Sequence, residues 1–128
     1  MNSINLFIYK LISEFCINRN KWKSYHFILK IVNVCSLNKN KYLDTNKCAE
    51  IFNKIDNHLN HLNLGNKCLI RSCMALLVLK AYKNNYLLNL GVKLNPFEAH
   101  AWITENDIPI FEKSDTDSYK VFKAFNYK

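Results

Sequence analysis

Apolar side chains recur every three or four residues through the first half of the chain, which is the spacing of one helix face. The pattern covers residues 3–17 and 21–36, and it returns after Asp44 or Thr45, either of which can cap a third helix. The inner face of this third helix would consist of Cys48, Ile51, Phe52, Ile55 and Leu59. We therefore predict three helices within residues 1–62, with the Asn/Lys-rich stretch 38–41 as a loop between the second and the third.

The pattern changes after Gly65, which interrupts the helical spacing. The apolar run at 68–83 is too long for a strand and is typical of a buried central helix. Residues 86–94 and 98–104 predict two strands, and 108–112 predict a third. Pro109 indicates that this third strand lies at a sheet edge.

Turn residues connect the predicted strands. Asn95-Pro96 would form one turn, and Glu105-Asn106-Asp107 would close a tight hairpin. Residues 114–118 predict a loop, and the tail at 119–128 is aromatic and basic. We therefore expect a single α+β domain over residues 1–128. Its helical segment, residues 1–62, would precede a catalytic segment, residues 63–128, with a central helix packed on a small antiparallel sheet.

Composition narrows the possible partners. The chain has 128 residues, about one domain, and only two Gly and two Pro, which disfavours an all-β fold rich in tight turns. Its net charge of +8 fits an acidic partner. Most of the positive charge comes from lysine, and asparagine is also abundant. Only Arg19 and Arg71 carry the guanidinium group that binds bases with two hydrogen bonds. Because the basic residues are scattered, we expect no nucleic-acid partner.

The five cysteines form no CxxC motif, and their number is odd. The first apolar run is cut by Lys10 and Glu14, so we expect no secretory signal, and no run approaches a membrane span. These features predict a cytoplasmic protein with free thiols and no membrane partner. No phosphate loop or metalloprotease motif occurs, and His58 and His61 lack further ligands at metal-site spacing, so we expect no cofactor and no metal.

Three residues in the second half carry the candidate chemistry. Cys68 begins the predicted central helix, where free N–H groups and the helix dipole favour a thiolate and can hold an oxyanion. His100 lies in the second predicted strand between small residues, and Trp102 should share its face. Glu112 follows the next turn, where a hairpin would bring it near His100. A nucleophile, a base and a group that orients the base are the components of a thiol acyl-transfer site.

Each of these residue types also has an ordinary structural role. A cysteine in an apolar run is usually a small buried hydrophobe, as we expect for Cys73. A histidine on a strand is often structural, and a carboxylate such as Glu112 is often solvated. The alternative to an enzyme is therefore a basic peptide-binding module whose Cys68 and His100 belong to its core.

The compound pattern resembles the leader-peptide proteases of lasso-peptide biosynthesis, which belong to the transglutaminase-like cysteine-protease superfamily. The resemblance spans about residues 65–115 and rests on Cys68-Leu-x-Arg-Ser, Leu90-Gly-Val-Lys, Pro96-Phe-x-Ala-His-Ala-Trp and the hairpin that follows. It implies a papain-like Cys–His–acid triad, with Cys68 and His100 in the first two roles. The family's third residue is usually Asp, where this chain has Glu112, so Asp107 and Asp115 remain alternatives.

The resemblance also implies a biological setting. Such a protease removes the leader from a ribosomally made precursor peptide, and a cyclase similar to asparagine synthetase then closes the ring. Some members carry an N-terminal leader-recognition domain, whereas the first 60 residues here predict helices. We therefore expect a free-standing protease that depends on a small leader-binding partner protein. A transglutaminase-like acyl transferase would use the same site up to deacylation.

Overall fold

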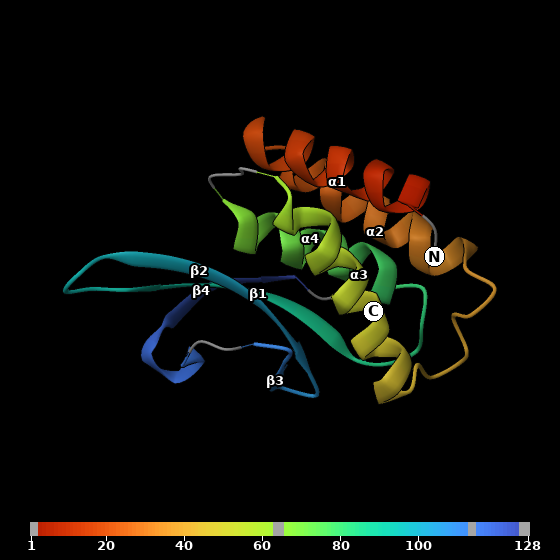
Figure 1. Cartoon of the computed structure of the whole chain (residues 1–128). Helices are drawn as coiled ribbons and strands as arrows, with labels where there is room; N and C mark the ends of the chain where they lie inside the picture. Colours follow the sequence, from red (N-terminus) through yellow and green to blue (C-terminus); the bar gives the residue numbers. More distant parts are fainter. Residues whose placement is uncertain (1–2, 63–65, 113–114, 126–128) are drawn as a thin grey trace.

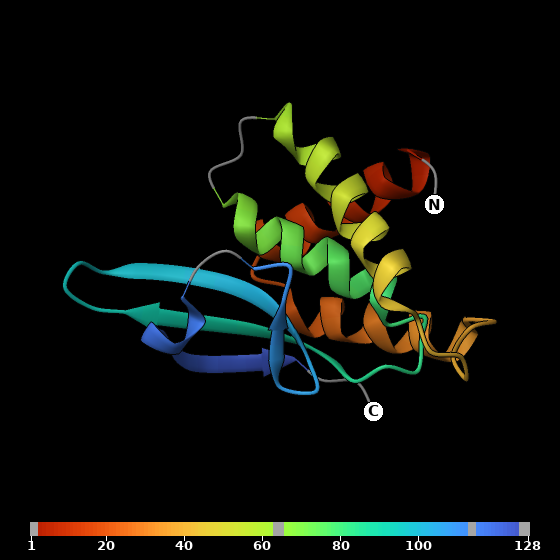
Figure 2. The ribbon, with the colours of Figure 1, turned by 60° about the horizontal axis from the view of Figure 1, so that its bottom comes forward.

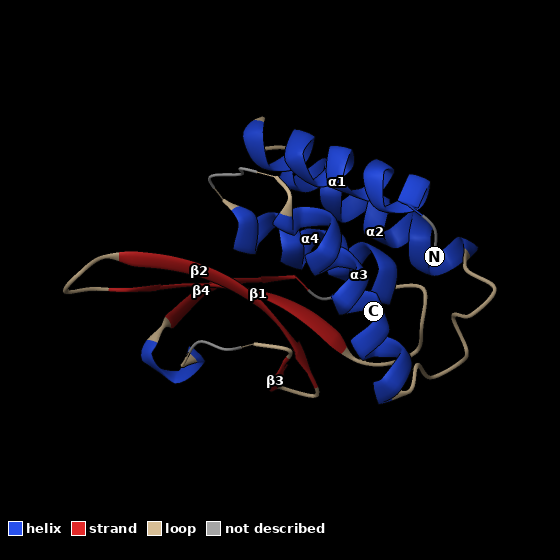
Figure 3. Ribbon diagram, viewed as in Figure 1, coloured by secondary structure: helices blue, strands red, loops and turns tan. Residues whose placement is uncertain are grey.

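Four helices lie on one face of a four-stranded antiparallel sheet in the computed structural model (Figures 1 and 3), which describes residues 3–62, 66–112 and 115–125. This arrangement confirms the predicted α+β class. The elements are α1 (Ser3–Asn18), α2 (Trp22–Cys35), α3 (Thr45–Asn60), α4 (Lys67–Leu79), β1 (Tyr86–Lys93), β2 (Glu98–Glu105), β3 (Ile108–Ile110), the short 3-10 helix η1 (Thr116–Ser118) and β4 (Lys120–Phe125).

Helix α3 illustrates how local sequence sets the helical layer. It begins after Asp44, whose carboxylate accepts a hydrogen bond from the Lys47 N–H at 2.8 Å and caps the first turn. Of its predicted inner face, Ile51 is half-buried and the other residues are buried: Cys48, Phe52, Ile55 and Leu59. The helical spacing of the sequence therefore identified the packed face correctly.

Helix α4 is the centre of the molecule and packs against α1, α3, β1 and β2 (Figure 2). Residues 72–77 are all buried, as expected for a central helix. It ends at Leu79 rather than at residue 83, because the next residues turn the chain through the bonds Ala81 N–H to Val78 and Tyr82 N–H to Leu79. The break predicted at 63–66 lies mostly outside the described residues.

The sheet has the order β3-β2-β1-β4, and its register fixes which side chains meet the helices. Leu90 pairs with Ala101, and Gly91 pairs with His100. Leu90 and Ala101 belong to the hydrophobic core, and strand alternation gives His100 and Trp102 a common side of β2. The predicted sharing of one face by His100 and Trp102 is confirmed, because their rings stack with centroids 5.8 Å apart.

The β2–β3 hairpin differs from the prediction in its length. Asn106 and Asp107 both have positive φ angles, of 51° and 67°, which suits a two-residue turn between twisted strands. Strand β3 is at the edge, as Pro109 indicated, but it ends at Ile110 instead of residue 112. Phe111 has a φ of 50°, which takes the chain out of the extended conformation and away from β2.

Strand β4 was not predicted from the sequence. It pairs with β1 from Leu88 to Val92 and covers the edge that the β1–β2 hairpin would otherwise leave open. The register shifts at Leu90 and Gly91, so β4 contains a bulge. Position 91 requires glycine, because a Cβ atom there would lie only 2.8 Å from the Trp102 ring.

Candidate active site

Cys68 lies in the first turn of α4, directly after Lys67 and the N-cap residue Asn66. Its side chain is half-buried, and its thiol is free. The first turn of a helix leaves its backbone N–H groups without partners inside the helix, and the positive end of the helix dipole lies there. The predicted position of Cys68 at a helix start is therefore confirmed, and this position suits both a thiolate and an oxyanion.

His100 and Glu112 form a close pair. Nε2 of His100 lies 3.0 Å from Oε1 of Glu112, and the two side chains are only 16% and 8% exposed. The ring N–H does not point at the oxygen as it would in a hydrogen bond, so the two groups are in contact at the distance of an ion pair. Because Nε2 faces the carboxylate, Nδ1 is the ring nitrogen left for another partner.

The two alternative acids lie elsewhere. Asp107 occupies the tight β2–β3 turn and is exposed. Asp115 caps η1, where its carboxylate accepts a hydrogen bond from the Asp117 N–H at 3.2 Å. Of the three candidates, Glu112 is the one that the structure pairs with His100.

A polar cavity of about 350 Å³ brings the candidate residues together. We call it the polar cavity, and it is lined by Asp56, Asn60, Cys68, Arg71, His100, Ala101, Phe111 and Glu112. Helices α3 and α4, strand β2 and the segment after β3 each contribute to its wall. The nucleophile and the base predicted from sequence thus open into one space, together with the acid.

Arg71 connects three regions of this wall and was not identified as a site residue from the sequence. It is one turn after Cys68 on α4, and its guanidinium pairs with Asp56 of α3. The same group donates to the carbonyl of Phe111 at 3.0 Å and lies 4.8 Å from the ring centre of Phe52. Its spacing from Cys68 was the available signal, because residues three apart share a helix face.

Two aromatic rings pack against the ring of His100. The Tyr119 ring lies 5.5 Å from the His100 ring and 6.0 Å from the Trp102 ring. The Tyr119 hydroxyl donates to Glu98 at 2.8 Å, and this bond, with Lys93 nearby, lowers the pKa of Glu98. Tyr119 precedes β4 and was missed from the sequence because nothing local signals its contact with β2.

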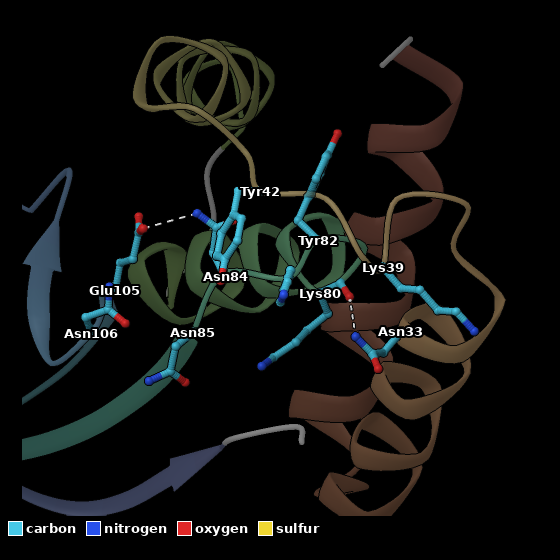
Figure 4. A pocket seen from close by; sticks show the side chains of 10 residues that line it. Asn33, Lys39, Tyr42, Lys80, Tyr82, Asn84, Asn85, Glu105 and Asn106 are labelled. Carbon is cyan, nitrogen blue, oxygen red and sulfur yellow. Dashed lines mark hydrogen bonds between the residues drawn. The ribbon is translucent and has the colours of Figure 1, made fainter.

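Another cavity, of about 430 Å³, lies at the opposite end of α4 and is lined by Asn33, Lys39, Tyr42, Lys80, Tyr82, Lys83, Asn84, Asn85, Glu105 and Asn106 (Figure 4). Asn84 donates to Glu105 at 3.1 Å and exchanges hydrogen bonds with the backbone of Leu43. The Lys80 ammonium donates to the carbonyl of Tyr86. These bonds join loop ends to α4 and the sheet, far along the helix from Cys68.

The remaining thiols differ from Cys68 in their surroundings. Cys16, Cys48 and Cys73 are buried, and burial raises the pKa of each thiol, to about 12 for Cys73. Cys35 is exposed at the end of α2. Among the described residues, no three His, Cys, Asp or Glu side chains gather as a metal site would, and His61 is the C-cap of α3.

A family model described as the transglutaminase-like superfamily matches residues 21–124, from the end of the α1–α2 connection to β4. The chain belongs to the transglutaminase-like superfamily. This membership confirms the superfamily that the sequence motifs indicated, whose members are usually cysteine peptidases or acyl transferases. Comparisons with curated proteins and with solved structures gave no significant match. Within the described residues, no helix has the length and apolarity to cross a membrane.

Proposed function

We propose that this transglutaminase-like protein is a cysteine peptidase that removes the leader from a ribosomally made lasso-peptide precursor. One observation carries the proposal: Cys68 at the start of α4 and the His100–Glu112 pair open into the same polar cavity. The three residue types and their order match the needs of thiol catalysis.

In the proposed reaction, His100 takes the thiol proton through Nδ1, and the Cys68 sulfur attacks the carbonyl at the leader–core junction. The C–S bond forms while the carbonyl oxygen becomes an oxyanion, which the Cys68 N–H helps to hold. The C–N bond then breaks as His100 returns the proton to the leaving amine. Water attacks the thioester, releases the leader as an acid and restores the thiol. Glu112 stabilises the imidazolium between these steps.

The motifs around the site support the choice of substrate. Cys68-Leu-x-Arg-Ser and Pro96-Phe-x-Ala-His-Ala-Trp resemble the lasso-peptide leader proteases, and both segments border the polar cavity through Cys68, Arg71 and His100. The same resemblance implies a partner cyclase, similar to asparagine synthetase, that uses the freed amine to close the ring.

A surface on α1 supports dependence on a leader-binding partner protein. Four large apolar side chains on this helix are about half exposed: Phe7, Ile8, Leu11 and Phe15. Residues 1–43 contain seven basic residues and one acidic residue, Glu14. On α1 itself, Lys10 pairs with Glu14 and lies over the Phe7 ring. An exposed apolar helix face fits a partner with an apolar surface, and the basic excess of residues 1–43 favours an acidic one. Such a partner would raise the local concentration of the bound precursor.

The test is cleavage of the precursor by the purified chain, with and without the leader-binding protein. We expect slow cleavage alone, faster cleavage with the partner, and none for Cys68→Ala. Cys35→Ala, which removes an exposed thiol remote from the cavity, should cleave like the parent. Cleavage by Cys68→Ala would overturn the proposal. If an added amine is joined to the leader in place of water, the chain is an acyl transferase.

A further inference from the structure

We propose that an apolar cavity beside Cys68 binds a bulky apolar side chain next to the reacting carbonyl of the substrate. This cavity has a volume of about 300 Å³ and is lined by Asn66, Cys68, Leu69, Leu90, Gly91, Ala99, His100, Ala101 and Phe122. We call it the apolar cavity. The inference rests on the proposed function, because it assigns a substrate class to the same nucleophile.

The lining of the apolar cavity suits a hydrocarbon group. Apart from Asn66, Cys68 and His100, every residue in its wall is apolar or glycine. Side-chain pockets of this kind, with few polar groups placed at one end, favour apolar ligands whose reacting end meets the polar groups. Here the polar end of the pocket is the candidate nucleophile and base.

A β-bulge builds one wall of the apolar cavity. Leu90 of β1 pairs with Lys123 of β4, and Gly91 pairs with Val121, so Phe122 is the extra residue between the two pairs. A bulge changes the direction of its side chain, and bulges are frequent beside active sites. Phe122 consequently lines the apolar cavity while 63% of its surface remains exposed. An exposed aromatic ring at a pocket mouth gains contact when a ligand covers it.

The polar and apolar cavities meet at the catalytic residues. They share Cys68, His100 and Ala101, but the polar cavity adds the charged groups Asp56, Arg71 and Glu112. Of the two cavities beside the thiol, only the apolar cavity has no Asp, Glu, Lys or Arg side chain in its wall, so it is the one that suits an apolar group. A chain lying across Cys68 would place a bulky apolar side chain in that space and polar groups in the other.

The experiment uses reagents of the form iodoacetyl–NH–R, which need no natural substrate. The thiol sulfur displaces iodide, so the C–S bond forms, the C–I bond breaks, and the thiol proton passes to His100 or to buffer. R is hydrogen, benzyl, isobutyl or carboxymethyl, and each rate is divided by the rate with a short cysteine peptide. We expect benzyl and isobutyl reagents to label Cys68 on the order of tenfold faster than the reagent with hydrogen, and carboxymethyl to show no gain.

Two variants and a matched control locate the effect. Ala99→Phe should fill the apolar cavity and bring the benzyl-to-hydrogen ratio down to that of the peptide. Phe122→Ala should lower the ratio a few-fold by removing one wall. Phe97→Ala removes an equally exposed ring, 67% against 63%, that does not line either cavity. This control should keep the parental ratio, and circular dichroism should confirm that all three variants fold.

The outcomes separate this inference from the proposed function. Cys68 that reacts with plain iodoacetamide no faster than the peptide, with no effect of His100→Ala, contradicts the catalytic role itself. An activated Cys68 that shows the same rate for every R overturns the apolar cavity alone. A benzyl preference that survives Ala99→Phe, or that is lost in Phe97→Ala, also overturns it.

Discussion

The Arg71 guanidinium donates a hydrogen bond to the carbonyl of Phe111, the residue immediately before Glu112, at 3.0 Å. Phe111 has a positive φ, which is costly for a bulky side chain and persists only when its surroundings hold it. Its ring also packs 4.9 Å from the ring of Phe52. Arg71 and Phe52 thus hold the strained turn that delivers Glu112 to His100, which makes Arg71 a positioning residue.

Arg71→Lys should therefore disturb the pairing of Glu112 with His100 while it keeps the positive charge. A lysine has no planar fork and cannot pair with Asp56 and bind the Phe111 carbonyl in the same way. We expect the alkylation rate of Cys68 at neutral pH to fall several-fold. The pH profile of that rate should come to match the profile of Glu112→Gln.

A double-mutant cycle distinguishes this role from general destabilisation. If Arg71 acts through Glu112, adding Arg71→Lys to Glu112→Gln should change the alkylation rate little further. Two losses that simply multiply would show that Arg71 affects Cys68 by another route. Thermal unfolding of each variant gives the stability control.

The free thiols should react in an order that exposure alone does not predict. Cys68 is half-buried and Cys35 is exposed, but only Cys68 combines a helix N-terminus with a nearby imidazole. We expect iodoacetamide to label Cys68 first, Cys35 more slowly, and the three buried thiols only when the protein unfolds. Mass spectrometry of the labelled peptides gives the order. Faster labelling of Cys35 than of Cys68 would argue against an activated nucleophile.

Local signals explain what the sequence predicted well. Asp44 at the start of α3 and the Asn106-Asp107 turn act within a few residues, so this helix and this hairpin could be placed from the sequence. Strand β4 could not be predicted, because its pairing with β1 joins distant segments and its sequence lacks alternation. Arg71 and Phe122 were missed for the same reason, since the former acts through the Phe111 carbonyl and the latter through a bulge.

Glu112 should be the acid of the triad rather than either nearby aspartate. Glu112→Gln removes the charge opposite Nε2 of His100, and we expect a loss of about tenfold to a thousandfold in single-turnover cleavage with the partner in excess. Glu112→Asp should lose less, because it keeps a carboxylate. Asp107→Asn and Asp115→Asn are matched controls that should cleave at the parental rate. A parental rate for Glu112→Gln together with a crippled aspartate variant would reassign the role.

The buried thiols should make the fold less stable in alkaline solution. Burial raises the pKa of Cys73 from its ordinary value of 9.0 to about 12, so the folded protein keeps this proton while the unfolded chain loses it. Ionisation of this thiol therefore stabilises the unfolded state relative to the folded state between about pH 9 and pH 12. The stabilisation is complete below pH 9 and falls by up to about 1.4 kcal/mol per pH unit above it.

Cys73→Ala separates this effect from other alkaline titrations. The variant should lose about 1 kcal/mol at pH 7, because a buried side chain is shortened, yet its free energy of unfolding should fall less steeply between pH 9 and 10.5. Urea denaturation at several pH values measures both quantities, and Cys35→Ala, at an exposed site, should keep the parental slope. Burial also raises the pKa of Cys48 and Tyr86, so some alkaline loss should remain. An unchanged slope in Cys73→Ala would mean that the thiol titrates alike in the folded and unfolded chains. That result would contradict the complete burial of Cys73, whose carbonyl accepts a hydrogen bond from the Tyr25 hydroxyl.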